Sequence, residues 1–241
     1  MLLLIIIAAI IYRNYRNKVK INEVLDEQKV QIETLLHNIL PDEIATELKV
    51  EGKAKPRFYE SVSVLFTDFK GFSTIADKLT PQELVEELNN YFIAFDDIVD
   101  KYNLEKIKTI GDSYMCAGGI PTINEDHTIN MVKAGLEMQE YIKKVNINRN
   151  ANGLASWHLR IGIHVGPLVA GVVGRKKYAY DIWGTTVNTA SRMESNGEEG
   201  LVNISKSVYE IIKNDYNCIY RGKISAKNIG EVDMYFVSNS I

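Results

Sequence analysis

The sequence predicts an α+β fold, a ferredoxin-like βαββαβ core with additional strands and helices, preceded by a membrane-proximal helix or coiled coil. Two observations support this prediction. Beyond residue 60, short β-branched and apolar runs alternate with segments of helical spacing in the order strand, helix, strand, strand, helix, strand. Before residue 40, apolar residues recur at heptad spacing, which is typical of a long helix.

The composition suits one globular domain with an appendage. The chain has 241 residues, a formal net charge of −3 and 46% hydrophobic residues. A general nucleic-acid binder would normally be basic, so nucleic acid is not an expected partner. The two cysteines, Cys116 and Cys218, have no metal-ligand spacing. We expect buried free thiols in a reducing compartment rather than a disulfide.

The chain begins with an almost purely aliphatic run over residues 1–12. A transmembrane helix needs about 20 apolar residues, so this run is too short to span a membrane by itself. Basic residues follow at once, as expected on the cytoplasmic side of a span: Arg13, Arg16, Lys18 and Lys20. We interpret residues 1–12 as the end of a transmembrane helix or, alternatively, as a short membrane anchor. Either places the protein at the cell membrane with its main domain in the cytoplasm.

Residues 13–52 are predicted to form a coiled-coil or signalling helix linker. One apolar seam, with Gln28 as its single polar position, consists of Ile21, Leu25, Ile32, Leu35 and Ile39. This seam favours a short parallel coiled coil and therefore a homodimer, and an amphipathic helix packed on the domain is the alternative. Pro41 interrupts the pattern near the start of a second helix. A polar linker over residues 52–60 leads into a domain predicted over residues 53–241.

The elements of this domain begin with a strand over residues 62–67 that ends at Asp68. A glycine-containing turn then leads to a helix from Phe72 or Ser73. Thr80-Pro81-Gln82-Glu83 is a capping box that opens a long helix, and Gly111-Asp112 predicts a hairpin turn. The remaining predictions are strands over 104–110, 113–117, 159–164, 168–173 and 201–204, helices over 128–143, 187–195 and from Ser205, a turn at Gly166-Pro167, and terminal strands ending with residues 234–237.

Two acidic residues follow strand-like runs directly, Asp68 before a glycine-containing turn and Asp112 in G-D-S-Y-M. Asp68 alone is better explained as a helix cap. However, a carboxylate at a strand end near a helix N-terminus also suits a divalent metal and a phosphate. Two such turns in one α/β pattern indicate a two-metal site.

Four ordered motifs carry a family resemblance: F-T-D-F-K-G-F, K-I-K-T-I-G-D-S-Y-M, L-R-I-G-I-H-V-G and Y-D-I-W-G-T-T-V-N-T-A-S-R-M-E. With them the chain closely resembles the class III nucleotidyl cyclases, the family of the mammalian adenylyl and guanylyl cyclase catalytic domains, over residues 61–237. The resemblance implies two divalent ions per site, Mg²⁺ or Mn²⁺, bound by Asp68, Asp112 and the carbonyl of Phe69. Such ions would lower the pKa of the ribose 3′-hydroxyl, which attacks the α-phosphate and releases pyrophosphate.

The resemblance also assigns catalytic and nucleotide-binding residues. Asn188 and Arg192 lie four apart on one helix face and match the transition-state pair of the family. Without the motif, Arg192 would be interpreted as a surface arginine paired with Glu194 or Glu198. The implied nucleotide-binding residues are Lys108, Asp181, Ile182, Lys227, Arg160 and Phe72.

Lys227 and Arg160 each have a second interpretation. Many relatives carry a second basic residue two positions after Lys227, where this chain has Ile229, so Lys223 could take part of its role. Arg160 matches an arginine on the phosphate side, although an arginine at a strand end is often structural. His164, on the same predicted strand, is interpreted as a packing histidine.

Lys108 and Asp181 match the base-reading positions of the family. Lysine only donates hydrogen bonds and ionised aspartate only accepts them, so the pair fits the N1 acceptor and 6-amino donor of adenine and opposes guanine. We therefore expect an adenylate cyclase that converts ATP to 3′,5′-cyclic AMP. The alternatives are a guanylate cyclase, a catalytically silent nucleotide-binding signalling domain, and a two-metal nucleotidyltransferase that makes linear products.

The resemblance implies sites that are shared between two chains. In the family, the metal aspartates and Arg160 come from one protomer, and the base-reading, transition-state and lysine positions come from the other. A chain with both halves should form a head-to-tail homodimer with two equivalent sites. The coiled coil would then set the angle between the protomers, under the control of an upstream sensor domain outside this sequence.

Overall fold

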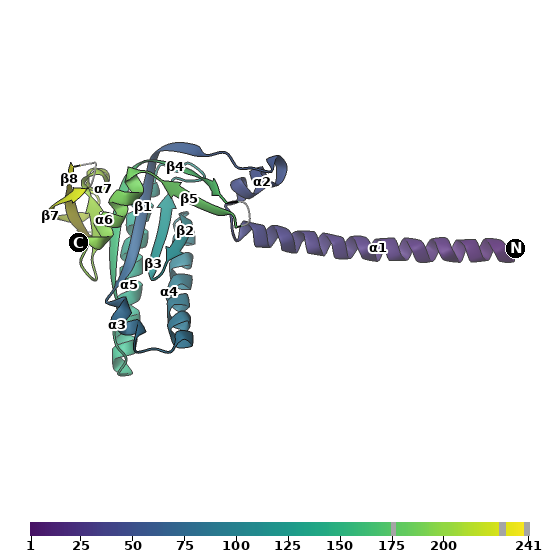
Figure 1. Cartoon of the computed structure of the whole chain (residues 1–241), viewed down its shortest axis with the longest axis horizontal. Helices are drawn as coiled ribbons and strands as arrows, with labels where there is room; N and C mark the ends of the chain where they lie inside the picture. The colour runs from purple at the N-terminus through teal and green to yellow at the C-terminus, as the bar shows by residue number, and fades with distance from the viewer. Residues whose placement is uncertain (175–176, 227–229, 239–241) are drawn as a thin grey trace. The chain divides into compact units, whose positions relative to one another are not determined.

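The computed structural model describes residues 1–174, 177–226 and 230–238. The chain divides into two compact units, Met1–Ala54 and Lys55–Ile241. The first unit is helical, and the second contains the sheet (Figure 1).

The first unit consists of α1 (Leu2–His37) and α2 (Asp42–Glu51). Pro41 is the N-cap of α2, which agrees with the predicted break, and Gly52 ends α2 in the left-handed region at φ 72°. All five residues of the predicted heptad seam are between 55% and 65% exposed in the single chain. Within the described residues, none of the helices contains an apolar stretch that could cross a membrane.

The second unit contains the predicted ferredoxin-like core, which is confirmed. Its strands lie in the order β2-β3-β1-β4, and each neighbouring pair is antiparallel. In chain order the core is β1 (Arg57–Lys70), α4 (Pro81–Lys101), β2 (Glu105–Ile110), β3 (Ser113–Gly118), α5 (His127–Ala151) and β4 (His158–Val173). The predicted hairpin turn joins β2 to β3, and the predicted capping box at Thr80 opens α4.

The additions extend this sheet beyond β4. β6 (Val202–Ser205) pairs parallel with β4 and is followed by β8 (Gly230–Ser238) and β7 (Asn217–Ala226). β5 (Ala179–Trp183) pairs with the second half of β4. The remaining helices are α3 (Phe72–Ala76), α6 (Thr185–Ser195) and α7 (Lys206–Ile212).

Opposite faces of the sheet carry different helices. Gly135 of α5 lies against the side chains of Leu65 and Ile163, whereas Gly162 lies against the backbone of α6. Because side chains alternate along a strand, Asp68 and Arg160 belong to the α6 face, opposite the core packed on α5. On the core side, the ring of Phe69 lies 5.0 Å from that of Trp157. The strands therefore separate a packed hydrophobic face from a face that carries charge.

Several predicted boundaries differ from the structure. β1 does not end at Asp68 but continues to Lys70, and α5 extends eight residues beyond the predicted end at Lys143. The predicted strands over 159–164 and 168–173 are one strand, since β4 runs through Gly166 and Pro167 without a turn. The pairing with β1 shifts register there, and proline is tolerated at such an irregularity. The prediction also missed β5.

Candidate active site

Asp68 lies on β1 directly opposite Arg160 of β4. Its Oδ2 accepts from Arg160 Nη2 at 2.7 Å, and its Oδ1 accepts from the hydroxyl of Ser113 at 2.9 Å. The N-cap of α3 is Gly71, and no side chain caps that helix. The helix-cap interpretation of Asp68 is therefore wrong, and its carboxylate faces a charged cluster instead.

Asp112 occupies the turn between β2 and β3, where Gly111 has φ 62°. Burial raises the pKa of the Asp112 carboxyl, and the negative charge of Asp68 raises it further. Hydrogen bonds from the backbone N–H groups of Asp112 and Phe69, and the charge of Arg160, oppose this rise. Asp68 and Asp112 are thus close enough to repel each other, a repulsion that a cation between them would remove.

A third carboxyl group, that of Glu194 on α6, joins this cluster. Its Oε1 lies 2.9 Å from Arg160 Nη2, the same nitrogen that contacts Asp68. Burial raises the pKa of Glu194 to about 7, the charges of Asp68 and Asp112 add to this, and Arg160 opposes it. We call Asp68, Asp112, Glu194 and Arg160 the acidic cluster.

The acidic cluster fits divalent ions bound with the help of a substrate. Across the described ranges, no three His, Cys, Asp or Glu side chains converge as a ready metal cage. Mg²⁺ commonly binds through one or two carboxylates plus substrate phosphates and water. Asp68 and Asp112 would supply the two carboxylates, and substrate and water would supply the other ligands. Phe69 as a whole is 2% exposed and its ring packs against Trp157 in the core, so its side chain is not an ion ligand.

The predicted base-reading residues lie together in one chain. Lys108 Nζ of β2 lies 2.5 Å from Asp181 Oδ2 of β5. The other carboxylate oxygen of Asp181 accepts from the backbone N–H of Ile182 at 2.9 Å, while the Ile182 side chain is buried. A donor and an acceptor therefore lie side by side, one from β2 and one from the middle of β5.

The predicted transition-state residues occupy α6, Asn188 exposed and Arg192 half-buried. The hydroxyl of Thr186 fixes the start of the helix by donating to the carbonyl of Pro167 at 2.6 Å. The alternative partners that the sequence suggested for Arg192 are engaged elsewhere, since Glu194 pairs with Arg160 and Glu198 with Arg221.

The other predicted residues have varied positions. Phe72 is half-buried, with its ring 6.1 Å from that of Trp157. Lys227 lies outside the described residues, and Lys223 pairs with Glu231 at 3.2 Å. His164 donates to or accepts from Ser205 at 2.7 Å, and burial lowers its pKa to about 4, which agrees with a packing role.

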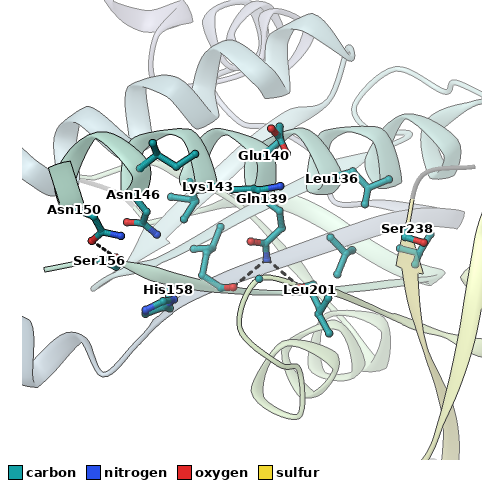
Figure 2. A pocket seen from close by; sticks show the side chains of 16 residues that line it. Leu136, Gln139, Glu140, Lys143, Asn146, Asn150, Ser156, His158, Leu201 and Ser238 are labelled. Carbon is teal, nitrogen blue, oxygen red and sulfur yellow. Dashed lines mark hydrogen bonds between the residues drawn. The ribbon is translucent and has the colours of Figure 1, made fainter. Parts of the chain in front are cut away.

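A separate groove of about 550 Å³ lies between α5 and the ends of β4, β6 and β8 (Figure 2). Gln139 crosses it and donates to the carbonyls of Leu159 and Leu201 at 3.0 Å each. None of the predicted site residues that the structure describes lines this groove. It is therefore not part of the candidate site.

Within one chain, the predicted residues thus form an acidic cluster and a separate Lys108–Asp181 pair. One member of the acidic cluster, Glu194, and the residue that donates to Asp68, Ser113, were not predicted from the sequence. Ser113 follows Asp112 directly in the hairpin motif, and its position opposite β1 could have indicated a contact with Asp68. The sequence suggested Glu194 only as a partner for Arg192, because the packing of α6 against β4 has no signal in the sequence.

This arrangement matches a known family. The model of the adenylate and guanylate cyclase catalytic domain matches residues 54–239. The chain belongs to this family. Its fold, an α+β sheet with helices on both faces, agrees with that of solved cyclase domains, including the adenylyl cyclase CyaB from P. aeruginosa, with a TM-score of 0.73 and 30% identity over 78% of this chain and 97% of that one.

The similar curated proteins include both kinds of cyclase. An adenylate cyclase of Mycobacterium tuberculosis is 38% identical over 92% of this chain and 49% of its own length. The receptor-type guanylate cyclase gcy-13 of Caenorhabditis elegans is 36% identical over 88% of this chain and 21% of its own length. The chain thus spans about half or less of these relatives, and family membership alone leaves the purine open.

Proposed function

We propose that the chain is an adenylate cyclase that converts ATP to 3′,5′-cyclic AMP and pyrophosphate at sites shared across a homodimer. The observation that carries the choice of ATP is the Lys108–Asp181 pair, at 2.5 Å. Adenine offers an acceptor at N1 and a donor at its 6-amino group, so it matches the lysine donor and the carboxylate acceptor. Guanine has a donor at N1 and an acceptor at O6, so neither protein group finds a partner on it. Such a mismatch lowers kcat/KM for GTP relative to ATP by orders of magnitude.

The acidic cluster would bind the two ions, Mg²⁺ or Mn²⁺, through Asp68, Asp112 and the carbonyl of Phe69. When bound, such ions lower the pKa of the 3′-hydroxyl and neutralise charge on the phosphates. Arg160, at 2.7 Å from Asp68, would bind phosphate oxygens next to these ions. Asn188 would orient the ribose, and Arg192 would stabilise the charge that develops on the α-phosphate. Lys227 would bind the terminal phosphates of the triphosphate.

The separation of these groups supports a site that is shared between two chains. The acidic cluster is drawn from β1, β4, α6 and the turn between β2 and β3, whereas the base-reading pair joins β2 to β5. Among the described residues, no side-chain hydrogen bond or ion pair joins the cluster to the pair. A second copy, placed head to tail, would bring one protomer's acidic cluster to its partner's base-reading pair. The exposed apolar seam of α1 supports such a dimer, because a coiled coil would bury it.

The membrane is a further proposed partner. Eleven of the first twelve residues are aliphatic, sulfur-containing or alanine, and four basic residues follow by Lys20. This pattern supports attachment to the cell membrane with the catalytic domain in the cytoplasm. Retention of a fluorescent fusion at the membrane, and its release when residues 1–12 are replaced by a polar sequence, would test this.

The direct test of function is product identification from purified protein given ATP or GTP with Mn²⁺. We expect cyclic AMP from ATP, little product from GTP, and none from an Asp112→Ala control. Cyclic GMP as the main product would indicate a guanylate cyclase. No cyclic product with either triphosphate, while nucleotide binding persists, would favour a catalytically silent signalling domain.

A further inference from the structure

We propose that Glu194 is a positioning residue that draws Arg160 partly away from Asp68 and so keeps the Asp68 carboxylate available for a cation. This inference rests on the proposed ion site and extends it to a residue that the motifs did not assign. One guanidinium nitrogen, Arg160 Nη2, serves two carboxylates, Asp68 at 2.7 Å and Glu194 at 2.9 Å.

The backbone of α6 fixes Glu194 in this position. A Cβ added at Gly162 would lie 1.9 Å from the backbone nitrogen of Glu194, so only glycine lets the end of α6 approach β4 this closely. Arg160 precedes Gly162 by two residues and therefore points to the same face of the sheet. From β6, the side-chain amide of Asn203 also holds this turn of α6 by donating to the carbonyl of Met193 at 2.7 Å.

The shared contact leaves the guanidinium incompletely bonded. Arg160 Nε is buried and has no hydrogen-bond partner among the described residues, and the Oε1 of Glu194 likewise accepts no aligned hydrogen bond, so its 2.9 Å contact with Arg160 is an ion pair. An arginine that faces a single carboxylate commonly forms two parallel hydrogen bonds and engages both oxygens. Glu194 opposes that arrangement, because its carboxylate attracts Arg160 from the α6 side. Without it, Arg160 would close on Asp68 and occupy the oxygens that a cation needs, with Ser113 already bonded to Oδ1.

The test measures Mn²⁺ binding by electron paramagnetic resonance in the full chain at pH 8, where Glu194 is ionised, with saturating pyrophosphate to supply the phosphate ligands. Glu194→Gln keeps the shape of the side chain and removes its charge, and we expect Mn²⁺ affinity to fall about tenfold. Glu198→Gln is the matched control, since Glu198 lies on the same stretch, is exposed and pairs with Arg221. We expect it to bind Mn²⁺ like the wild type. Circular dichroism of each variant confirms folding.

A double-mutant cycle separates positioning from general negative charge. If Glu194 acts through Arg160, then Glu194→Gln should have little effect on Mn²⁺ affinity in an Arg160→Met background. A tenfold loss that persists in that background would overturn the proposal, and so would unchanged affinity in the single variant. The Arg160→Met, Glu194→Gln protein removes both charges of the Arg160–Glu194 ion pair together, while Asp68 keeps its hydrogen bond from Ser113. Folding of both Arg160→Met proteins is checked by circular dichroism before their Mn²⁺ affinities are compared.

The outcome also separates this inference from the proposed function. If the wild-type protein shows no Mn²⁺ binding that depends on Asp112, the ion site and the role of Glu194 fall together. If binding depends on Asp112 but not on Glu194, only the role of Glu194 falls. The identity of the nucleotide product is decided independently by the ATP and GTP assay.

Discussion

The two charged regions of the domain differ in how their charges are balanced. Lys108 and Asp181 form a one-to-one pair, and a backbone N–H satisfies the second oxygen of Asp181. In the acidic cluster, the guanidinium of Arg160 lies within 2.9 Å of two carboxyl groups, those of Asp68 and Glu194, and its charge also acts on the carboxyl of Asp112. The pair is therefore complete as it stands, whereas the cluster has more carboxyl groups than cationic ones and suits cations. In the proposed site, the pair would recognise the base by exchanging its internal contact for contacts with the base.

The largest effect should come from Asp112→Asn. The amide cannot replace an anionic ligand, so we expect cyclase activity to fall about a thousandfold or more. Since burial and Asp68 raise the pKa of Asp112, the ionised form costs stability in the absence of ions. The variant should therefore melt at a higher temperature than the metal-free wild type, measured by calorimetry. A variant that is both inactive and less stable would contradict this view of the cluster.

Gly162→Ala should destabilise the attachment of α6 to the acidic cluster. The added Cβ would approach the backbone of Glu194 to 1.9 Å, and we expect a loss of about 3 kcal/mol in unfolding free energy, measured by urea titration. Gly135→Ala is the control, because a Cβ there has its nearest neighbours at 3.4 Å and the site lies inside α5. The control should change stability by less than about 1 kcal/mol. Equal losses in both variants would refute the close contact.

Exchange of the base-reading pair should change selectivity and leave the acidic cluster intact. Lys108→Glu with Asp181→Cys removes both contacts that fit adenine, and we expect the preference for ATP over GTP to fall about a hundredfold in kcat/KM. Mn²⁺ binding should stay unchanged, because neither Lys108 nor Asp181 is a proposed ion ligand. A strict ATP preference in the double variant would show that other residues read the base.

The smallest expected effect concerns pH. The folded-state pKa of Glu194, about 7, lies above its usual value of 4.5, so this group stabilises the fold fully below pH 4.5 and that stabilisation is lost as the pH rises through 7. Relative to Glu194→Gln, the metal-free wild type should lose about 2 kcal/mol of unfolding free energy over this range. His164, whose pKa is lowered to about 4, contributes the opposite slope in both proteins and cancels in the comparison. Parallel stability curves for the two proteins would contradict the assignment.

Local signals in the sequence predicted the local structure well. The turn at Gly111-Asp112 requires the positive φ that the structure has at Gly111, and the capping box at Thr80 depends on residues three apart. Both are set by short-range sterics and hydrogen bonds. The order of the core strands followed from the alternation of elements, because few topologies suit that order.

Predictions that depended on distant pairing were less successful. Gly166-Pro167 has the composition of a turn, yet β1 pairs with both sides of it and keeps β4 straight through a register shift. The position of Glu194 depends on the close approach of two backbones at Gly162, a contact 32 residues away along the chain. Such contacts arise from packing, and a single sequence carries no local signal for them.

Mixing two inactive variants tests the shared site most directly. Asp68→Ala lacks the acidic half of each site, and Arg192→Ala lacks the transition-state half. After subunit exchange, half of the dimers in an equal mixture combine both variants and hold one intact site out of two, so we predict about a quarter of the wild-type cyclic AMP synthesis. If the exchanged mixture stays as inactive as either variant alone, both halves of the site must act within one chain, and the account is wrong.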